Sequence, residues 1–343
     1  MKRIGADDIG EEGELFATHI GGAATIEGVM MRGRLSWAVA VRRPDGDIYV
    51  EEHDLAPACD RPAWTRLPIV RGCASFVESM LLSYRALDIA SAHAYEDEDS
   101  EASVERGEAA SQAGFSGGEF ALSVGIGLVV GVGLFVGLPV LAATAALGPM
   151  TAENSLGWNL IEAAVRIALL IAYVGGVGLI PDMARLYGYH GAEHQAIHCF
   201  EHGLPLTPEN AARFSRLHVR CGTAFLVMTV AVALIVHAVV PVGAAADSLG
   251  LSGIWRNLFV LASRIAMVPL VAGASYEVTV KWAGAHPDSP LVKIALWPGM
   301  QMQRLTTRKA EGGMLECAIA ALQRVDARER AALGDRKDEA DAA

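Results

Sequence analysis

Four long apolar segments constrain the fold of this chain more than any other feature of its sequence. They cover residues 120–147, 158–180, 222–246 and 254–278. About 20 helical residues cross the roughly 30 Å of hydrocarbon in a bilayer, so each segment is long enough to span a membrane. The first and third segments contain no Asp, Glu, Lys or Arg. The sequence therefore predicts a mainly α-helical, multi-pass membrane protein with about four transmembrane helices.

The connections between these segments differ in their basic residues. Residues 148–157 and 247–253 contain no Lys or Arg. The central connection, 181–221, contains several arginines, and further basic residues follow the fourth segment from Lys281 onwards. Because positively charged loops stay on the cytoplasmic side, this pattern predicts that both termini and the central connection are cytoplasmic.

The chain before the first span divides into three regions. Residues 1–20 are polar and predict a loose N-terminus. Residues 21–93 predict a small cytoplasmic β unit followed by an amphipathic helix over about 67–92. Residues 94–119 are rich in Glu, Ser, Ala and Gly, which predicts an acidic flexible linker. The strands of the β unit are expected over Ala23–Met31, Trp37–Arg43 and Ile48–Val50.

The remaining chain forms a membrane domain and a C-terminal segment. The membrane domain is expected over residues 120–284, and a cytoplasmic segment over 285–343. In the latter, an apolar stripe predicts an amphipathic helix over Gly313–Val325. The charged, alanine-rich tail after Val325 is expected to fray.

Composition narrows the possible partners. The formal net charge of −11 argues against nucleic acid, because no basic stripe is present to neutralise phosphates. The long apolar segments instead predict the lipid bilayer as the main partner. The five cysteines are scattered and odd in number, which is typical of a reducing compartment rather than of a disulfide framework.

The central connection carries most of the candidate chemistry. Pro181 and Asp182 predict a helix start, and Gly203 predicts its end, so a helix of about 20 residues is expected here. A second, shorter helix is expected from Thr207 to near His218. On the longer helix, 3.6 residues per turn bring five polar residues onto one stripe. These residues are His190, Glu193, His194, His198 and Glu201.

The spacing His190-x-x-Glu193-His194 is that of an inverted zinc-peptidase motif. Two imidazoles one turn apart can bind one divalent metal, with zinc as the expected ion, while Glu193 acts as general base on a metal-bound water. A third ligand has to come from elsewhere in the chain, since catalytic zinc usually has three protein ligands. Glu277 is the predicted third ligand, because it lies at the cytoplasmic end of the fourth span. His198, His218 and Cys221 are the alternative ligands.

Several motifs together resemble the YqhQ-like family of bacterial membrane proteins. They occur in order over most of the chain, at Gly21–Gly33, Tyr189–Glu201, Phe214–His218, Arg220–Thr223, Ser275–Glu277 and Leu305–Arg308. The resemblance implies a multi-pass protein of the bacterial cytoplasmic membrane. It also implies a suspected metal dependence, which rests on the same His/Glu motif. Glu27 and Arg32 belong to the resemblance, but no chemistry follows from them at this point.

Three functions are compatible with these features. The first is a zinc-dependent hydrolase at the cytoplasmic membrane face, acting on a membrane-associated peptide or lipid-like substrate. The second is a non-enzymatic scaffold or assembly factor, which a closed structural site of His190, His194, His218 and Cys221 would favour. The third is a small transporter, with the charged residues Glu162, Arg166 and Arg264 along its path.

Overall fold

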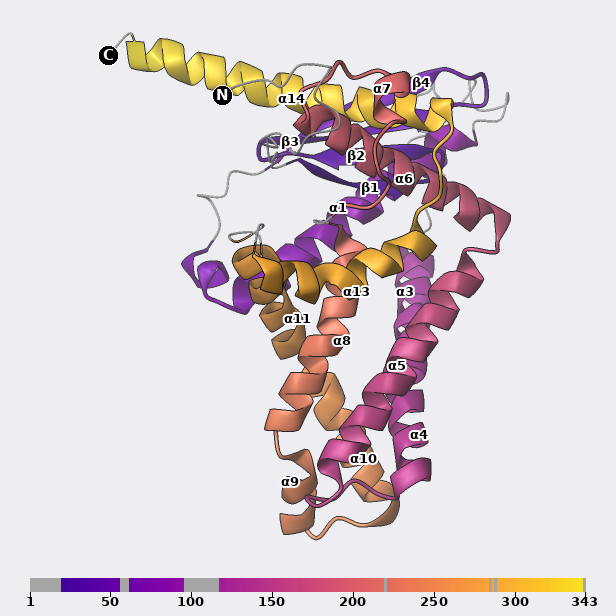
Figure 1. The fold of residues 1–343 in the computed structure, drawn as a ribbon, viewed down its shortest axis with the longest axis vertical. Coiled ribbons are helices and arrows are strands. Elements are labelled where there is room, and N and C mark those ends of the chain that lie inside the picture. The colour runs from indigo at the N-terminus through magenta and orange to yellow at the C-terminus, as the bar shows by residue number, and fades with distance from the viewer. Residues whose placement is uncertain are drawn as a thin grey trace.

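A computed structural model describes residues 20–55, 62–95, 117–218, 221–283, 286 and 289–341. The predicted loose N-terminus, 1–20, and the predicted linker, 94–119, lie almost entirely outside these residues. The described chain forms two layers, a bundle of long helices and a head that contains a β-sheet (Figure 1).

The bundle contains four helices that are long and apolar enough to cross a membrane, which confirms the predicted spans. They cover Gly125–Leu147, Ser155–Val177, Phe225–Ser248 and Gly253–Val280. The first span consists of α3 (Gly117–Val132), η5 (Gly133–Gly137) and α4 (Leu138–Leu147), and the second is the single helix α5 (Ser155–Val177). The third span consists of α8 (Gly222–Val239) and α9 (Val242–Ser248). The fourth consists of α10 (Gly253–Ala266), α11 (Val268–Tyr276) and η6 (Glu277–Trp282).

The head is organised around an antiparallel sheet in the order β1-β2-β3-β4. Its strands are β1 (Gly21–Thr25), β2 (Gly28–Arg32), β3 (Ser36–Arg42) and β4 (Ile48–Asp54). Side chains alternate between the two faces of a strand, and here both faces are covered. Val29 and Met31 pack in a core with α6 (Pro181–Glu201) and α14 (Gly312–Asp341), whereas Met30 packs with α1 (Val70–Ala94).

The single strand predicted over Ala23–Met31 is instead a hairpin, β1 and β2, with a tight turn at Ile26 and Glu27. The segment is apolar on both sides of the turn, which hid the break from the sequence pattern. Glu27 adopts a φ of 48°, in the left-handed region that residues other than glycine adopt mainly in turns. The predicted β unit is therefore confirmed, with one more strand than expected.

Helix α1 joins the head to the bundle. Leu82, Ala86 and Ala90 face the sheet, while Gly72 packs on α11. A Cβ at Gly72 would lie 3.0 Å from the Cα of Gly273, so the two helix backbones approach each other closely through glycines. The amphipathic helix predicted from the sequence thus contacts both layers.

Three further segments complete the fold. Helix α7 spans only Pro208–Ala211, so the prediction that it continues to His218 is wrong, although Thr207 does cap it. Residues 212–218 run as an irregular strap. Helix α13 (Pro290–Thr306) lies across the end of the bundle beneath the head (Figure 1). Helix α14 continues to Asp341, well beyond the predicted end at Val325.

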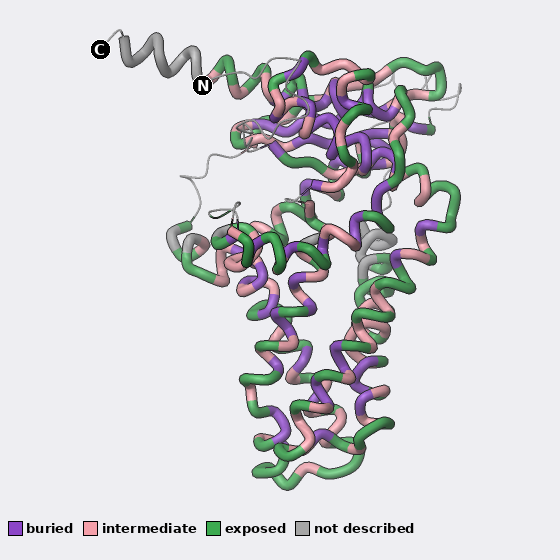
Figure 2. The backbone as a smooth tube through the Cα atoms, viewed as in Figure 1, coloured by how far each residue is buried: buried purple, intermediate pink, exposed green. Residues whose placement is uncertain are grey.

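Buried residues concentrate in the head, and the sides of the bundle are largely exposed (Figure 2). The exposed side chains of the bundle include large apolar ones such as Leu128, Val129 and Ile235, as expected where lipid replaces water. The sheet, α6 and α14 all lie at the same end of the bundle (Figure 1). This is the arrangement expected for four spans, because the segments before the first, after the second and after the fourth span then lie on the same side of the membrane.

Candidate metal centre

Helix α6 begins at Pro181, as predicted, and Asp182 lies in its first turn. Gly203, with a φ of 69°, follows its C-terminal end. In the middle of the helix, a Cβ on Gly191 would lie 2.1 Å from the backbone carbonyl oxygen of Arg308. Only glycine lets α6 pack this closely against the connection between α13 and α14. That contact holds the histidine face of α6 next to α13.

His190 and His194 each give one ring nitrogen to a backbone carbonyl. Nδ1 of His190 lies 2.9 Å from the carbonyl oxygen of Thr306, and Nδ1 of His194 lies 2.6 Å from that of Arg216. A carbonyl oxygen only accepts hydrogen bonds, so each neutral ring carries its proton on Nδ1 and keeps a lone pair on Nε2. Metal-ligating histidines are oriented by bonds of this kind. Burial lowers the pKa of His194, which favours its neutral form.

The Nε2 atoms of these histidines lie next to Cys221. Nε2 of His190 is 3.1 Å from Sγ of Cys221. Nε2 of His194 is buried and has no hydrogen-bond partner among the described residues. One donor atom from each of the three residues lies within 4.8 Å of the other two. Two imidazoles and a thiolate form a donor set that suits zinc.

Cys221 is positioned by the start of α8, where it is the N-cap residue. Its sulfur accepts a hydrogen bond from the backbone N–H of Thr223 at 3.5 Å. The positive end of a helix stabilises a thiolate, the form of cysteine that binds metals. The structure therefore brings a residue that was an alternative in the sequence prediction next to both predicted histidine ligands.

Glu193, the predicted general base, is buried between α6 and β1. A Cβ on Gly22 would lie 3.1 Å from its Cδ, so the carboxyl group fits against a strand that carries no side chain there. Burial raises the pKa of Glu193 to about 7, although nearby His190 and the Gly22 N–H oppose this shift. Its Oε2 has no hydrogen-bond partner in the described part of the chain. A carboxyl group with this pKa can exchange a proton near neutral pH, as a general base must.

His198 and His218 lie together on the other side of His194. They form a second group of possible metal ligands with Glu201, again with donor atoms within 4.8 Å of one another. The rings of His194 and His218 have their centroids 5.7 Å apart. Burial lowers the pKa of His198 to about 4.

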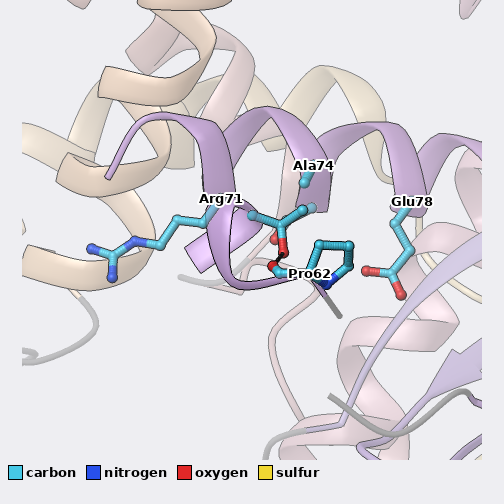
Figure 3. Close-up of a pocket in the computed structure, with 6 residues that line it drawn as sticks. Pro62, Arg71, Ala74 and Glu78 are labelled. Carbon is cyan, nitrogen blue, oxygen red and sulfur yellow. Dashed lines mark hydrogen bonds between the residues drawn. The ribbon is translucent and has the colours of Figure 1, made fainter. Parts of the chain in front are cut away.

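The structure does not bring Glu277 to His190 and His194. Its carboxylate accepts a hydrogen bond of 2.6 Å from Nε of Arg71 and a second bond from Nη2 of the same side chain. Arg71 comes from α1, and Figure 3 shows it extending away from a shallow pocket on that helix. The lining residues are Pro62, Thr65, Arg71, Ala74, Ser75 and Glu78. The carboxylate at the end of the fourth span is thus paired with an arginine, which corrects its predicted role as a metal ligand.

Three charged residues inside the spans form ion pairs with one another, namely Glu162, Arg166 and Arg264. Nη2 of Arg264 lies 3.2 Å from Oε2 of Glu162, and Nη2 of Arg166 lies 2.5 Å from Oε1 of the same carboxylate. Glu162 and Arg264 are each 1% exposed. Nε of Arg166 also donates to the carbonyl oxygen of Phe135 in the π-helical turn η5, at 2.8 Å. This arrangement is that of an internal ion-pair network.

Glu27, which had no assigned role, connects the sheet to α6. From the turn between β1 and β2, its carboxylate accepts two hydrogen bonds from Arg185, of 2.5 Å from Nε and 2.6 Å from Nη2. The hydroxyl of Tyr189 donates a third bond of 3.1 Å. Hydrogen bonding and the charge of Arg185 hold the pKa of Glu27 below its ordinary value.

Glu27→Gln is expected to lower the free energy of unfolding by about 1 kcal/mol at neutral pH, a small value because Arg185 is half exposed. A depressed folded-state pKa means that the stabilisation is complete above the unfolded pKa of about 4.5 and is lost as pH falls through the folded value. The difference between wild type and variant, measured by denaturant unfolding in detergent, should therefore shrink below about pH 4.5. An equal difference at pH 7 and at acid pH would contradict this electrostatic role.

Two groups that position the candidate histidine ligands were not predicted from the sequence. The carbonyl oxygen of Thr306 orients His190, and the side chain of Gln303 holds the backbone of His218 through bonds of 2.8 Å in both directions. Both belong to α13, far from α6 in the chain. The only sequence signal was the Leu305–Arg308 motif of the family resemblance, because a backbone carbonyl leaves no trace in residue identity.

Comparison with known proteins places the chain in a family. The family model described as "Protein of unknown function (DUF1385)" matches residues 67–328. The chain belongs to this family. It is also 30% identical over 306 residues to the "Uncharacterized protein YqhQ" of Bacillus subtilis (strain 168), an alignment that covers 87% of this chain and 89% of the relative. No solved structure matches the chain significantly. The YqhQ-like family membership predicted from the sequence motifs is thereby confirmed, whereas the metal dependence that the resemblance implied stays a prediction.

Proposed function

We propose that this membrane protein binds a zinc ion through His190, His194 and Cys221, on the cytoplasmic face of the membrane, and that it is a zinc-dependent hydrolase. One observation carries the metal assignment. Both histidines donate one ring nitrogen to a backbone carbonyl and direct the other towards a cysteine at a helix N-terminus. Holding both rings in this orientation costs conformational entropy, and it leaves the buried Nε2 of His194 without a hydrogen-bond partner. A zinc ion bound to the free ring nitrogens would offset the first cost and supply the missing partner.

The number of donors favours a catalytic site over a structural one. His218, the fourth member of a closed site, groups with His198 and Glu201 instead of with His190 and Cys221. Three protein ligands leave one position for water or substrate, which is the pattern of catalytic zinc. A zinc ion in this position would lower the pKa of a bound water and polarise a carbonyl or phosphoryl group. Glu193, one residue from His194, is the candidate base.

The position of the site in the fold favours substrates that are associated with the membrane. The site lies where α6, α8 and α13 meet, between the head and the bundle (Figure 1). Helix α13 exposes Leu291, Ile294 and Trp297, side chains suited to the membrane interface. The basic connections of the chain lie at this end of the bundle, which supports a cytoplasmic orientation. A membrane-associated peptide or a lipid-like molecule could reach such a site from the interface.

Metal analysis of the purified full-length protein tests the first part of the proposal. We expect wild type to retain zinc after desalting and His190→Ala, His194→Ala and Cys221→Ser each to lose it, by 10-fold or more in affinity. Cobalt substitution adds a direct readout, since a thiolate ligand produces a charge-transfer band that Cys221→Ser should abolish. His53→Ala, on β4, is the matched control, because it removes a histidine outside the site. Zinc retention in all three variants would refute the site.

Glu193→Gln separates catalysis from a structural role. The variant should keep its zinc while losing hydrolysis of peptide and ester libraries presented in lipid vesicles, by a factor of about 10²–10⁴. If wild type binds zinc but hydrolyses nothing in these libraries, and if cobalt spectra show four protein ligands, the scaffold function would replace the hydrolase.

A further inference from the structure

Helix α1 carries apolar side chains on two opposite sides. One side, with Leu82, Ala86 and Ala90, packs against the sheet. The other side carries large apolar side chains that are between 41% and 60% exposed. We define the α1 stripe as Phe76, Val77, Met80, Leu81 and Leu87. At 3.6 residues per turn these residues fall on one side of the helix. A contiguous exposed apolar surface of this kind marks an interaction site.

The α1 stripe begins where the spans of the bundle end. The ring of Phe76, its first residue, has its centroid 6.1 Å from that of Phe225, the first residue of the third span. One turn earlier, Gly72 packs against Gly273 in the fourth span. Both contacts lie at the end of the bundle that carries the head, near the edge of the hydrocarbon that the spans cross. The stripe is therefore continuous with the exposed apolar sides of the bundle, where lipid replaces water.

Helix α13 presents a similar exposed side at the same end of the bundle. Leu291, Ile294 and Trp297 are exposed, and so are Lys293 and Arg304 on the same helix. Figure 1 shows α13 lying across the end of the bundle, while α1 rises from that level to the sheet. Tryptophan and basic side chains are favoured where hydrocarbon meets the lipid headgroups. The two helices thus have the composition and the position of helices that lie in a membrane interface.

The bilayer is the occupant of the α1 stripe that these observations favour. The sheet packs on the opposite side of α1, so the stripe faces away from the head. A second copy of the chain or a soluble partner would have to displace lipid from a surface that begins at the ends of two spans. We infer that the α1 stripe lies in the lipid interface of the membrane that the spans cross, so that α1 and α13 together hold the head against the bilayer. The inference is independent of the proposed zinc site, since neither helix contributes a ligand to it.

Photo-crosslinking of the full-length protein in vesicles of phosphatidylethanolamine and phosphatidylglycerol tests this inference. The photoreactive residue p-benzoylphenylalanine replaces Met80 or Leu81, whose exposed side chains can be exchanged without disturbing the core. Mass spectrometry is expected to find lipid adducts at both positions, in a yield similar to that at Leu128 in the first span. Gln323 is the matched control, because it is exposed on α14, which covers the other face of the sheet. Its lipid-adduct yield should be lower by about 10-fold.

The chemical identity of the adduct distinguishes the possible occupants. A covalent dimer formed from Met80 and Leu81 without lipid adducts would overturn the inference and assign the stripe to a second copy of the chain. Adducts with another segment of the same chain, again without lipid, would overturn it as well. A lipid-adduct yield at both positions as low as that at Gln323 would show that the stripe faces water, which also contradicts the inference.

Carbene labelling of wild type provides a measurement that needs no substitution. A carbene precursor dissolved in the lipid of the same vesicles is expected to modify the peptide that contains Phe76–Leu87 as well as the four spans. The peptide of α14 that contains Gln323 should remain unmodified. Modification confined to the spans would overturn the inference, even if the variants at Met80 and Leu81 failed to fold.

Discussion

Glu162→Gln is expected to destabilise the membrane bundle by about 3–5 kcal/mol, one of the largest effects of a single substitution in this chain. Glu162 is the only acidic residue that contacts Arg166 and Arg264 among the ion pairs of the described residues. Its loss leaves two guanidinium groups buried between helices without a counter-charge. His237, whose Nδ1 lies 3.5 Å from the same carboxylate, also loses its partner.

Thermal unfolding in detergent, followed by loss of monodisperse protein, measures this effect. Glu153→Gln is the matched control, because Glu153 is an exposed residue in the loop before α5. Replacing the network as a whole, with Leu at positions 162, 166 and 264, should recover much of the stability, since buried ion pairs often contribute little net free energy. A melting temperature of Glu162→Gln equal to that of the control would contradict the ion-pair network. That result would favour the transporter hypothesis, in which these residues line a water-filled path.

Gly191→Ala is expected to cost about 1–3 kcal/mol and to weaken metal binding. The added Cβ would lie 2.1 Å from the carbonyl oxygen of Arg308, which is backbone and cannot rotate away. Helix α6 must therefore move from the connection that follows Thr306, whose carbonyl oxygen orients His190. The variant should show both a lower unfolding free energy and a lower zinc content.

Gly188→Ala, one turn earlier on the same helix, is the control. Its Cβ would meet only Sδ and Cε of Met314, at 2.7 and 3.1 Å, and a methionine side chain can adjust. Alanine also has a higher helix propensity than glycine, by about 1 kcal/mol, which offsets part of the contact. Equal losses of stability and zinc in the two variants would show that the Arg308 contact is not what positions the histidines.

Much of the architecture could be predicted because it depends on local patterns. Apolar length identifies each span without knowledge of its neighbours, and all four were found. Pro181 and Gly203 mark the ends of α6 through backbone preferences that are local in the same way. The histidine stripe follows from helix geometry alone. Where two local signals competed, as at the turn around Glu27 or in the tail after Val325, the prediction was less accurate.

The candidate site shows where such reasoning stops. Glu277 was chosen because it lies at the correct depth for the third ligand, but depth along a span does not determine which neighbour the side chain faces. Arg71 from α1 takes this carboxylate, and it does so because Gly72 and Gly273 let α1 and α11 touch. Cys221, at the start of another span, meets His190 instead.

The sequence by itself determined the number of spans, the family and the face of α6 that carries the histidines. Only the tertiary structure decided which donors meet that face and which ring nitrogens remain free for a metal. The reason is physical: Thr306, Arg216 and Cys221 all lie outside α6, and their contacts with it arise from the packing of α13, the strap and α8. Two of these three contacts use backbone carbonyls, which every residue type possesses and no sequence pattern can distinguish.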